Sequence, residues 1–179
     1  MSYEGRQIRG LRINTPTEEG VEKPVFFIES GIHAREWIAP ATTTYFINQL
    51  LTSSNRNVTR LRDQFDWRIF PTVNPDGYHY SYVFVQIGKV SLDYGYQVNT
   101  EKYSGPGTAA ETLYKASGGS MDWVRYALNT PLVYTYELRG SSFHWPSEKI
   151  PEQGEEVTQM ILGLATEAEN MGYYYSDIA

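Results

Sequence analysis

The stretch PVFFIESGIHAREWIAPATTTYFINQLL, residues 24–51, combines the two patterns from which the fold of this chain is predicted. Its first six residues are apolar on both faces of an extended chain, which is typical of a central strand. From residue 37 onward the apolar residues fall at helical spacing, and Pro40 fits the first turn of a helix, where a missing N–H is tolerated. A strand followed directly by a helix indicates an α/β fold.

The same alternation of strands and helices continues along the chain. Further strands are predicted at residues 8–13, 66–73, 82–92 and 132–138 (LVYTYEL), and a turn at residues 74–77 (NPDG). Helical spacing recurs at residues 109–116 and 121–128, and in a last helix that opens at Pro151. These elements predict one domain over residues 1–179, with a mixed β-sheet flanked by helices.

Composition and charge exclude several classes of function. The net charge of −6 disfavours nucleic acid as a partner, because phosphate binding needs a basic surface. The chain has no cysteine, which excludes disulfides, thiolate metal sites and a cysteine nucleophile. No apolar run reaches the length of a membrane span, and the residues after Met1 do not form a signal peptide.

His33 and Glu36 follow the predicted strand at residues 24–29, and Gly31 lets the backbone turn between strand and pair. Histidine nitrogen and glutamate oxygen are both good zinc ligands, and two such residues three apart can converge on one ion. The alternative is a structural histidine beside a surface ion pair between Arg35 and Glu36. For the short H-x-x-E pattern taken by itself, that alternative is favoured.

Glu137 is a second candidate for chemistry. It lies near the end of the alternating segment at residues 132–138, where a carboxylate would be partly removed from water and suited to act as a general base. A salt bridge to Arg139 at the end of a strand explains the same pattern equally well. The sequence feature alone leaves both interpretations open.

Five segments together carry a resemblance to a known family: SYEGR (2–6), SGIHAREWIAPAT (30–42), FPTVNPDGY (70–78), YKASGGSMDW (114–123) and YTYELR (134–139). In this order they resemble the zinc metallocarboxypeptidases of the carboxypeptidase A/B type, peptidase family M14. The resemblance implies a carboxypeptidase-like fold and a protein that removes C-terminal residues from peptides with water activated by one zinc ion. It also implies a secreted or extracellular protein.

The resemblance assigns roles to matching positions. His33 and Glu36 correspond to two zinc ligands, and Glu137 to the general base that activates the attacking water. Arg35 resembles the arginine that guides or polarises the substrate carbonyl. The substrate side is represented by Tyr114, which resembles the tyrosine that closes over the C-terminal residue, and by Met121, where the family reads that residue's side chain. Methionine there implies an apolar or aromatic preference.

The chain also departs from the family's pattern. The third zinc ligand is a histidine on a later strand, and Phe84 stands at its place. The family's first strand and helix, and a long stretch after Tyr80 that carries the substrate-carboxylate clamp, have no match. His79 and His144 are the other histidines that could complete the site. The sequence therefore predicts either a zinc carboxypeptidase or an impaired or inactive member or fragment that at most binds a peptide or partner, with zinc held weakly.

Overall fold

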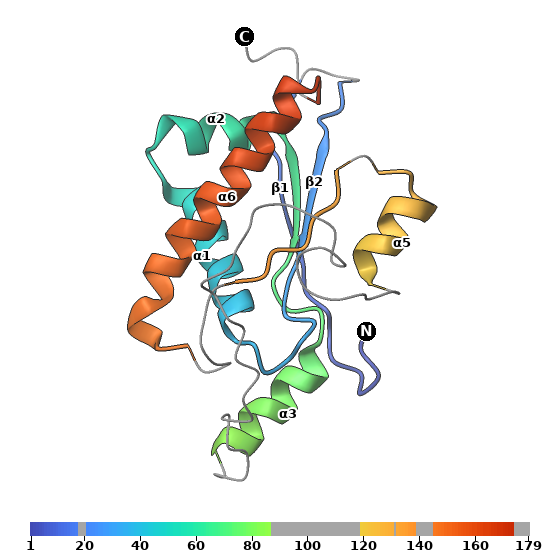
Figure 1. Ribbon diagram of the computed structural model, residues 1–179, viewed down its shortest axis with the longest axis vertical. Coiled ribbons are helices and arrows are strands. Elements are labelled where there is room, and N and C mark those ends of the chain that lie inside the picture. Colours follow the sequence, from blue (N-terminus) through green and yellow to red (C-terminus); the bar gives the residue numbers. More distant parts are fainter. Residues whose placement is uncertain (18–20, 87–118, 131, 139–144, 174–179) are drawn as a thin grey trace. The chain divides into compact units, whose positions relative to one another are not determined.

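The computed structural model describes residues 1–17, 21–86, 119–130, 132–138 and 145–173, with only the backbone described for residues 83–86. In these ranges the elements are β1 (Leu11–Ile13), β2 (Val25–Glu29), α1 (Ile38–Thr52), α2 (Arg56–Gln64), β3 (Asp66–Phe70), α3 (Pro75–Gln86), α5 (Ser120–Ala127), η2 (Ser147–Lys149) and α6 (Ile150–Asn170) (Figure 1). They fall into two compact units. The larger contains β1 to α3 with η2 and α6, and the smaller contains α5 and the segment after it.

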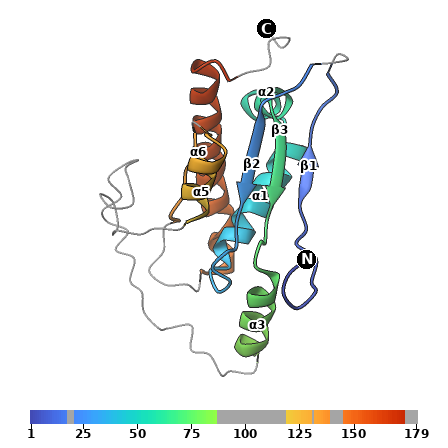
Figure 2. The same cartoon turned by 90° about the vertical axis from the view of Figure 1, so that its right-hand side faces the viewer.

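The strands described in the larger unit form one sheet in the order β1-β3-β2. β1 runs antiparallel to β3, with Ile13 opposite Trp67, whereas β2 runs parallel to β3, with Phe26 opposite Trp67. The parallel pair requires a crossover connection, and α1 and α2 supply it. Figure 2, turned by 90° from Figure 1, shows α6 on one side of this sheet.

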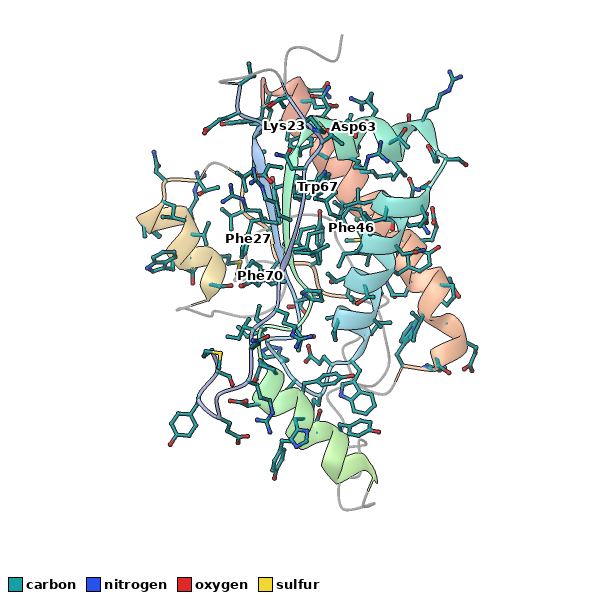
Figure 3. All side chains as sticks on the ribbon, turned by 180° about the vertical axis from the view of Figure 1, so that it is seen from behind. Lys23, Phe27, Phe46, Asp63, Trp67 and Phe70 are labelled. Carbon is teal, nitrogen blue, oxygen red and sulfur yellow. The ribbon has the colours of Figure 1, made fainter. Side chains whose placement is uncertain are left out.

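The core of the larger unit lies between the sheet and the helices. Trp67 and Phe46 are fully buried, and their rings meet edge to face with centroids 5.5 Å apart (Figure 3). Phe26 also stacks on Trp67, with centroids 4.6 Å apart, and the indole N–H donates to the carbonyl of Leu61 at 3.2 Å. Burying each such side chain contributes roughly 1.5–3 kcal/mol, so this cluster fixes α1 against the sheet.

Most sequence predictions for the larger unit are confirmed. The strands expected at residues 8–13, 24–29 and 66–73 correspond to β1, β2 and β3, and the expected helices correspond to α1 and α6. The expectation that the strand at residues 24–29 is central is wrong for the described sheet, because β3 lies in the middle and Val25 and Phe27 of β2 are exposed. In the smaller unit α5 matches the predicted helix at residues 121–128. An α/β fold with a small mixed sheet is thereby confirmed, while the prediction of one domain over the whole chain stays a prediction.

Three predictions of secondary structure are wrong. Residues 75–77 open α3 instead of forming an isolated turn, and residues 82–86 continue that helix instead of starting a strand. The reason is local: Asn74 Oδ1 accepts a hydrogen bond from the Gly77 N–H at 2.9 Å, and Pro75 has its ring φ already suited to a helix start. Residues 87–92 and the helix predicted at residues 109–116 lie outside the described residues.

The third wrong prediction concerns the segment LVYTYEL. Residues 132–138 have no regular secondary structure, although their polar and apolar residues alternate. An extended segment becomes a strand only when a neighbouring backbone pairs with it, and within the described residues none does. In that same part of the chain, none of the helices is long and apolar enough to cross a membrane.

Candidate metal-binding loop

The loop between β2 and α1 carries His33 and leaves the sheet at the carboxyl ends of the two parallel strands. Ser30 keeps this loop beside the segment that follows β3: its N–H donates to the Phe70 carbonyl at 3.0 Å and its carbonyl accepts from the Val73 N–H at 3.0 Å. Its hydroxyl donates to the carbonyl of Pro71 at 2.6 Å. The carboxyl edge of parallel strands is the usual place for ligand sites in α/β proteins.

Gly31 makes the turn that aims the loop away from the sheet. Its φ is +72°, a conformation that costs side-chain-bearing residues energy. A Cβ at this position would also lie 3.3 Å from the Thr72 Cα and 3.4 Å from the Pro71 carbonyl oxygen. Both the backbone conformation and the close approach therefore require glycine here, as the sequence predicted for the turn.

His33 and Glu36 lie side by side on this loop. The Glu36 N–H donates to the His33 carbonyl at 3.0 Å, which folds the loop into a turn just before α1. Their side chains meet with His33 Nδ1 3.3 Å from Glu36 Oε2, and they are 73% and 36% exposed. An imidazole nitrogen and a carboxylate oxygen at this separation can both reach an ion that binds at roughly 2 Å, so the pair fits two of the ligands that zinc uses.

A third ligand is not found among the described residues, where no three histidine, aspartate or glutamate side chains gather into a possible metal site. His79 is exposed on α3 and is not part of such a group. His144 and Tyr114 lie outside the described residues. Arg35 is exposed on the same loop, between His33 and Glu36, so these three residues are the part of the predicted site that one loop carries.

Glu137 and Met121 belong to the smaller unit. Glu137 is exposed within that unit, and its role as a general base stays a prediction. The Thr135 hydroxyl lies 3.1 Å from the sulfur of Met121, and this contact joins α5 to the segment that carries Glu137. The two candidates thus lie in the same unit.

Asp76 joins the SYEGR segment to the NPDG segment. Its carboxylate accepts from the Ser2 hydroxyl at 2.8 Å, from the Glu4 N–H at 3.0 Å and from Arg6 Nη1 at 2.7 Å. Burial alone would raise the pKa of Asp76, but the hydrogen bonds from Glu4, Arg6 and Ser2 outweigh it and hold this pKa below its ordinary value. The ionised carboxylate therefore fastens the N-terminal segment to the start of α3.

Comparison with known proteins places the chain. The family model described as zinc carboxypeptidase, peptidase family M14, matches residues 1–88 and 84–160. The chain belongs to the zinc carboxypeptidase family. The resemblance found in the sequence is thereby confirmed. Zinc-dependent hydrolysis at the C-termini of peptides and proteins is the general chemistry of this family. The two matched ranges meet at residues 84–88, within and just after α3.

Individual members of the zinc carboxypeptidase family refine this result. A zinc carboxypeptidase of Simulium vittatum is 28% identical over 274 aligned positions, which cover 97% of the chain and 89% of the relative. Because 274 positions exceed the 179 residues of the chain, the relative carries a long stretch with no counterpart here. An inactive metallocarboxypeptidase, ECM14 of Uncinocarpus reesii, is 40% identical over 87 positions, or 45% of the chain and 15% of the relative.

A solved structure supports the carboxypeptidase fold. The crystal structure of thrombin activatable fibrinolysis inhibitor (TAFI) superposes with a TM-score of 0.74, at 18% identity, over 93% of this chain and 67% of that one. At this identity the likeness shows the fold alone.

Proposed function

We propose that this chain is a zinc carboxypeptidase that removes C-terminal residues from peptides, with His33 and Glu36 holding one zinc ion. The observation that carries the proposal is the pairing of His33 Nδ1 with Glu36 Oε2 at 3.3 Å on an exposed loop. The pair lies at the carboxyl edge of the parallel strands, where a substrate has access to it. Extracellular peptides and protein C-termini are the proposed substrates, and the net charge of −6 argues against nucleic acid.

The protein's own residues have distinct proposed roles. A bound zinc ion would supply Lewis acidity, polarising the scissile carbonyl and lowering the pKa of water beside it. Glu137 takes the proton from the attacking water and later passes it to the leaving amine. Arg35 places a positive charge near the carbonyl oxygen, where negative charge develops in the transition state.

Two residues of the proposal act on the substrate's C-terminal residue. Tyr114 closes over that residue, which keeps water out and fixes its orientation. Met121 lines the pocket for its side chain, and an uncharged thioether favours an apolar or aromatic residue over a basic one.

A second candidate function is that of a weakly active or inactive family member that binds peptides or a partner. Two observations favour it: the described residues offer no third ligand beside His33 and Glu36, and an inactive relative matches nearly half of the chain. Two protein ligands hold zinc less tightly than three. Phe84, which the sequence places at the third-ligand position, is part of helix α3, and its side chain is not among those described.

Peptide hydrolysis separates the two candidates. The purified chain, incubated with zinc, is assayed for release of phenylalanine from a short peptide with that residue at its C-terminus. The first candidate predicts release that Glu137→Gln abolishes while zinc is still bound, because only the proton transfer is removed. A peptide ending in lysine is the matched control and should be cleaved more slowly. If wild type with zinc bound releases no phenylalanine, the result supports the second candidate function.

A further inference from the structure

The two backbone carbonyls on either side of His33 are both approached by side chains of one other segment. Asn74 Nδ2 donates to the carbonyl of Ile32 at 3.0 Å, and the hydroxyl of Ser81 lies 3.2 Å from the carbonyl of Ala34. Ile32 and Ala34 are the direct neighbours of His33 in the chain. The backbone that carries the imidazole is therefore held before and after it.

Asn74 and Ser81 are well placed to hold the loop because each is itself fixed. Asn74 caps α3 through Oδ1, so its amide group is oriented and its Nδ2 points back to the loop. Ser81 lies two turns further along α3, and its hydroxyl accepts a hydrogen bond from the indole N–H of Trp37 at 3.0 Å. That hydroxyl carries one proton, which it can direct to Ala34 or to the helix carbonyl of Tyr78 at 2.9 Å.

Trp37 extends the same support to the other member of the pair, because it directly follows Glu36. Its ring packs against two tyrosines of α3, with centroids 5.8 Å from Tyr78 and 6.2 Å from Tyr82. Between Asn74 and Ser81, Gly77 lets the helix approach: a Cβ there would lie 2.6 Å from the Cβ of Ala34. One face of α3 thus contacts the loop from Ile32 to Trp37.

We infer that Asn74 and Ser81 are positioning residues for the His33–Glu36 pair. They do not touch the metal themselves; they fix the loop so that the imidazole and the carboxylate stay side by side. This inference rests on the proposed zinc-binding role of the pair. Groups that orient metal ligands from behind typically change metal affinity by about 10- to 100-fold when they are removed.

The test uses substitutions that each remove one side-chain group in contact with the loop and keep the helix intact. Asn74→Ser leaves a good N-cap acceptor for Gly77, since serine and asparagine cap about equally well, but its short side chain loses the amide donor to Ile32. The matched control is Asn55→Ser: Asn55 caps α2 by accepting from the Asn57 N–H, and no bond from its side chain to the loop is found in the described residues. Ser81→Ala removes the hydroxyl, and Ser81→Thr restores it.

The measured quantity is the dissociation constant for zinc alone, from competition with a chromophoric chelator at a temperature where circular dichroism shows every variant folded. Asn74→Ser and Ser81→Ala should each weaken zinc binding about tenfold. Asn55→Ser and Ser81→Thr should bind zinc as wild type does. The urea midpoint of the metal-free protein gives a second readout, and it should fall no further in Asn74→Ser than in Asn55→Ser.

The outcomes separate the inference from the proposal beneath it. Wild-type zinc affinity in Asn74→Ser and Ser81→Ala overturns the positioning role and leaves the zinc site standing. A loss of zinc affinity in Asn55→Ser equal to that in Asn74→Ser also overturns it, because general loosening would then be the cause. If wild type binds no zinc, or binds it equally well after His33→Ala, the proposed metal site fails and the inference with it.

Discussion

Replacing Gly77 with alanine tests the close contact between α3 and the His33 loop. A Cβ at residue 77 would lie 2.6 Å from the Cβ of Ala34 and 2.8 and 2.9 Å from the amide nitrogen and oxygen of the Asn74 side chain. Carbon atoms in contact normally lie about 3.5–4.0 Å apart, so the methyl group overlaps Ala34 by roughly 1 Å. The Cβ of Ala34 cannot rotate away, and the Asn74 amide is held by two hydrogen bonds. The loop backbone must therefore move.

Two opposing terms set the size of the effect. Forcing an extra methyl group into a packed contact costs about 1–3 kcal/mol. Alanine in a helix is favoured over glycine by at most about 1 kcal/mol. The net expectation for Gly77→Ala is a loss of roughly 1 kcal/mol in the free energy of unfolding. Gly163 in α6 is the matched control, because a Cβ there meets nothing within 4 Å. Gly163→Ala should raise stability by about 0.5–1 kcal/mol.

Urea unfolding followed by circular dichroism measures both variants and the double variant Gly77→Ala/Ala34→Gly. The double variant removes the atom that the new methyl group meets, so it should recover part of the loss beyond what Ala34→Gly does alone. The reasoning is refuted if Gly77→Ala stabilises the protein as Gly163→Ala does. That result would mean that α3 and the loop are further apart than the 2.6 Å between a Cβ at residue 77 and the Cβ of Ala34 implies.

Three further changes probe the fold. Asp66 is 3% exposed, and its burial would raise its pKa, but hydrogen bonds from Arg12 and Arg68 hold that pKa below its ordinary value. The stability that these hydrogen bonds give is therefore present above about pH 4 and is lost as the pH falls through the pKa of Asp66 in the folded protein. Asp66→Asn should lower the free energy of unfolding by about 1–2 kcal/mol at neutral pH and make it depend less on pH in acid; an unchanged dependence on acid pH contradicts the assignment. Phe46→Ala should lower the free energy of unfolding in urea by about 3–5 kcal/mol, whereas Leu51→Ala, at an exposed position on the same helix, should change it by no more than about 0.5 kcal/mol. Similar losses in the two variants would argue against the core described. Gly31→Ala should cost more than Gly5→Ala, since both have positive φ but only Gly31 lies against the backbone of Thr72; equal midpoints would rule that contact out.

The elements that the sequence predicted are those whose pattern reflects burial within the larger unit. In β2 the side chains of Phe26 and Ile28 are more buried than those of Val25 and Phe27, which follows the two-residue repeat of a strand. The helical spacing in α6 likewise matches its buried residues, including Val157 and Ile161. Such patterns can be read locally because each residue's burial depends on one face of one element.

The sequence predictions of secondary structure fail where a neighbouring strand or a helix cap decides the structure. The aromatic and β-branched residues that favour a strand after residue 81 continue a helix, because Asn74 and Pro75 had already started it. Alternation in LVYTYEL does not produce a strand without a paired backbone. Asparagine followed by proline was interpreted only as a turn, although this pair is also a signature of a helix start.

For the candidate site, local sequence supplied the pair and the resemblance supplied the roles. His33 and Glu36 lie three residues apart on one short turn, so their proximity follows from local geometry. The contacts of Asn74 and Ser81 with the loop join residues more than forty positions apart, and no local pattern signals them. The roles of Glu137 and Tyr114 rest on the resemblance and remain predictions.

Zinc bound per chain after dialysis, in wild type and in His33→Ala, tests the central claim most directly. Metal analysis is carried out after equilibration with micromolar zinc and removal of the excess. The account predicts that wild type retains measurable zinc, no more than one ion per chain and held weakly enough for a mild chelator to remove it, and that His33→Ala retains almost none. Equal zinc retention by wild type and His33→Ala, or none by either, would contradict the assignment of His33 and Glu36 as the metal-binding pair.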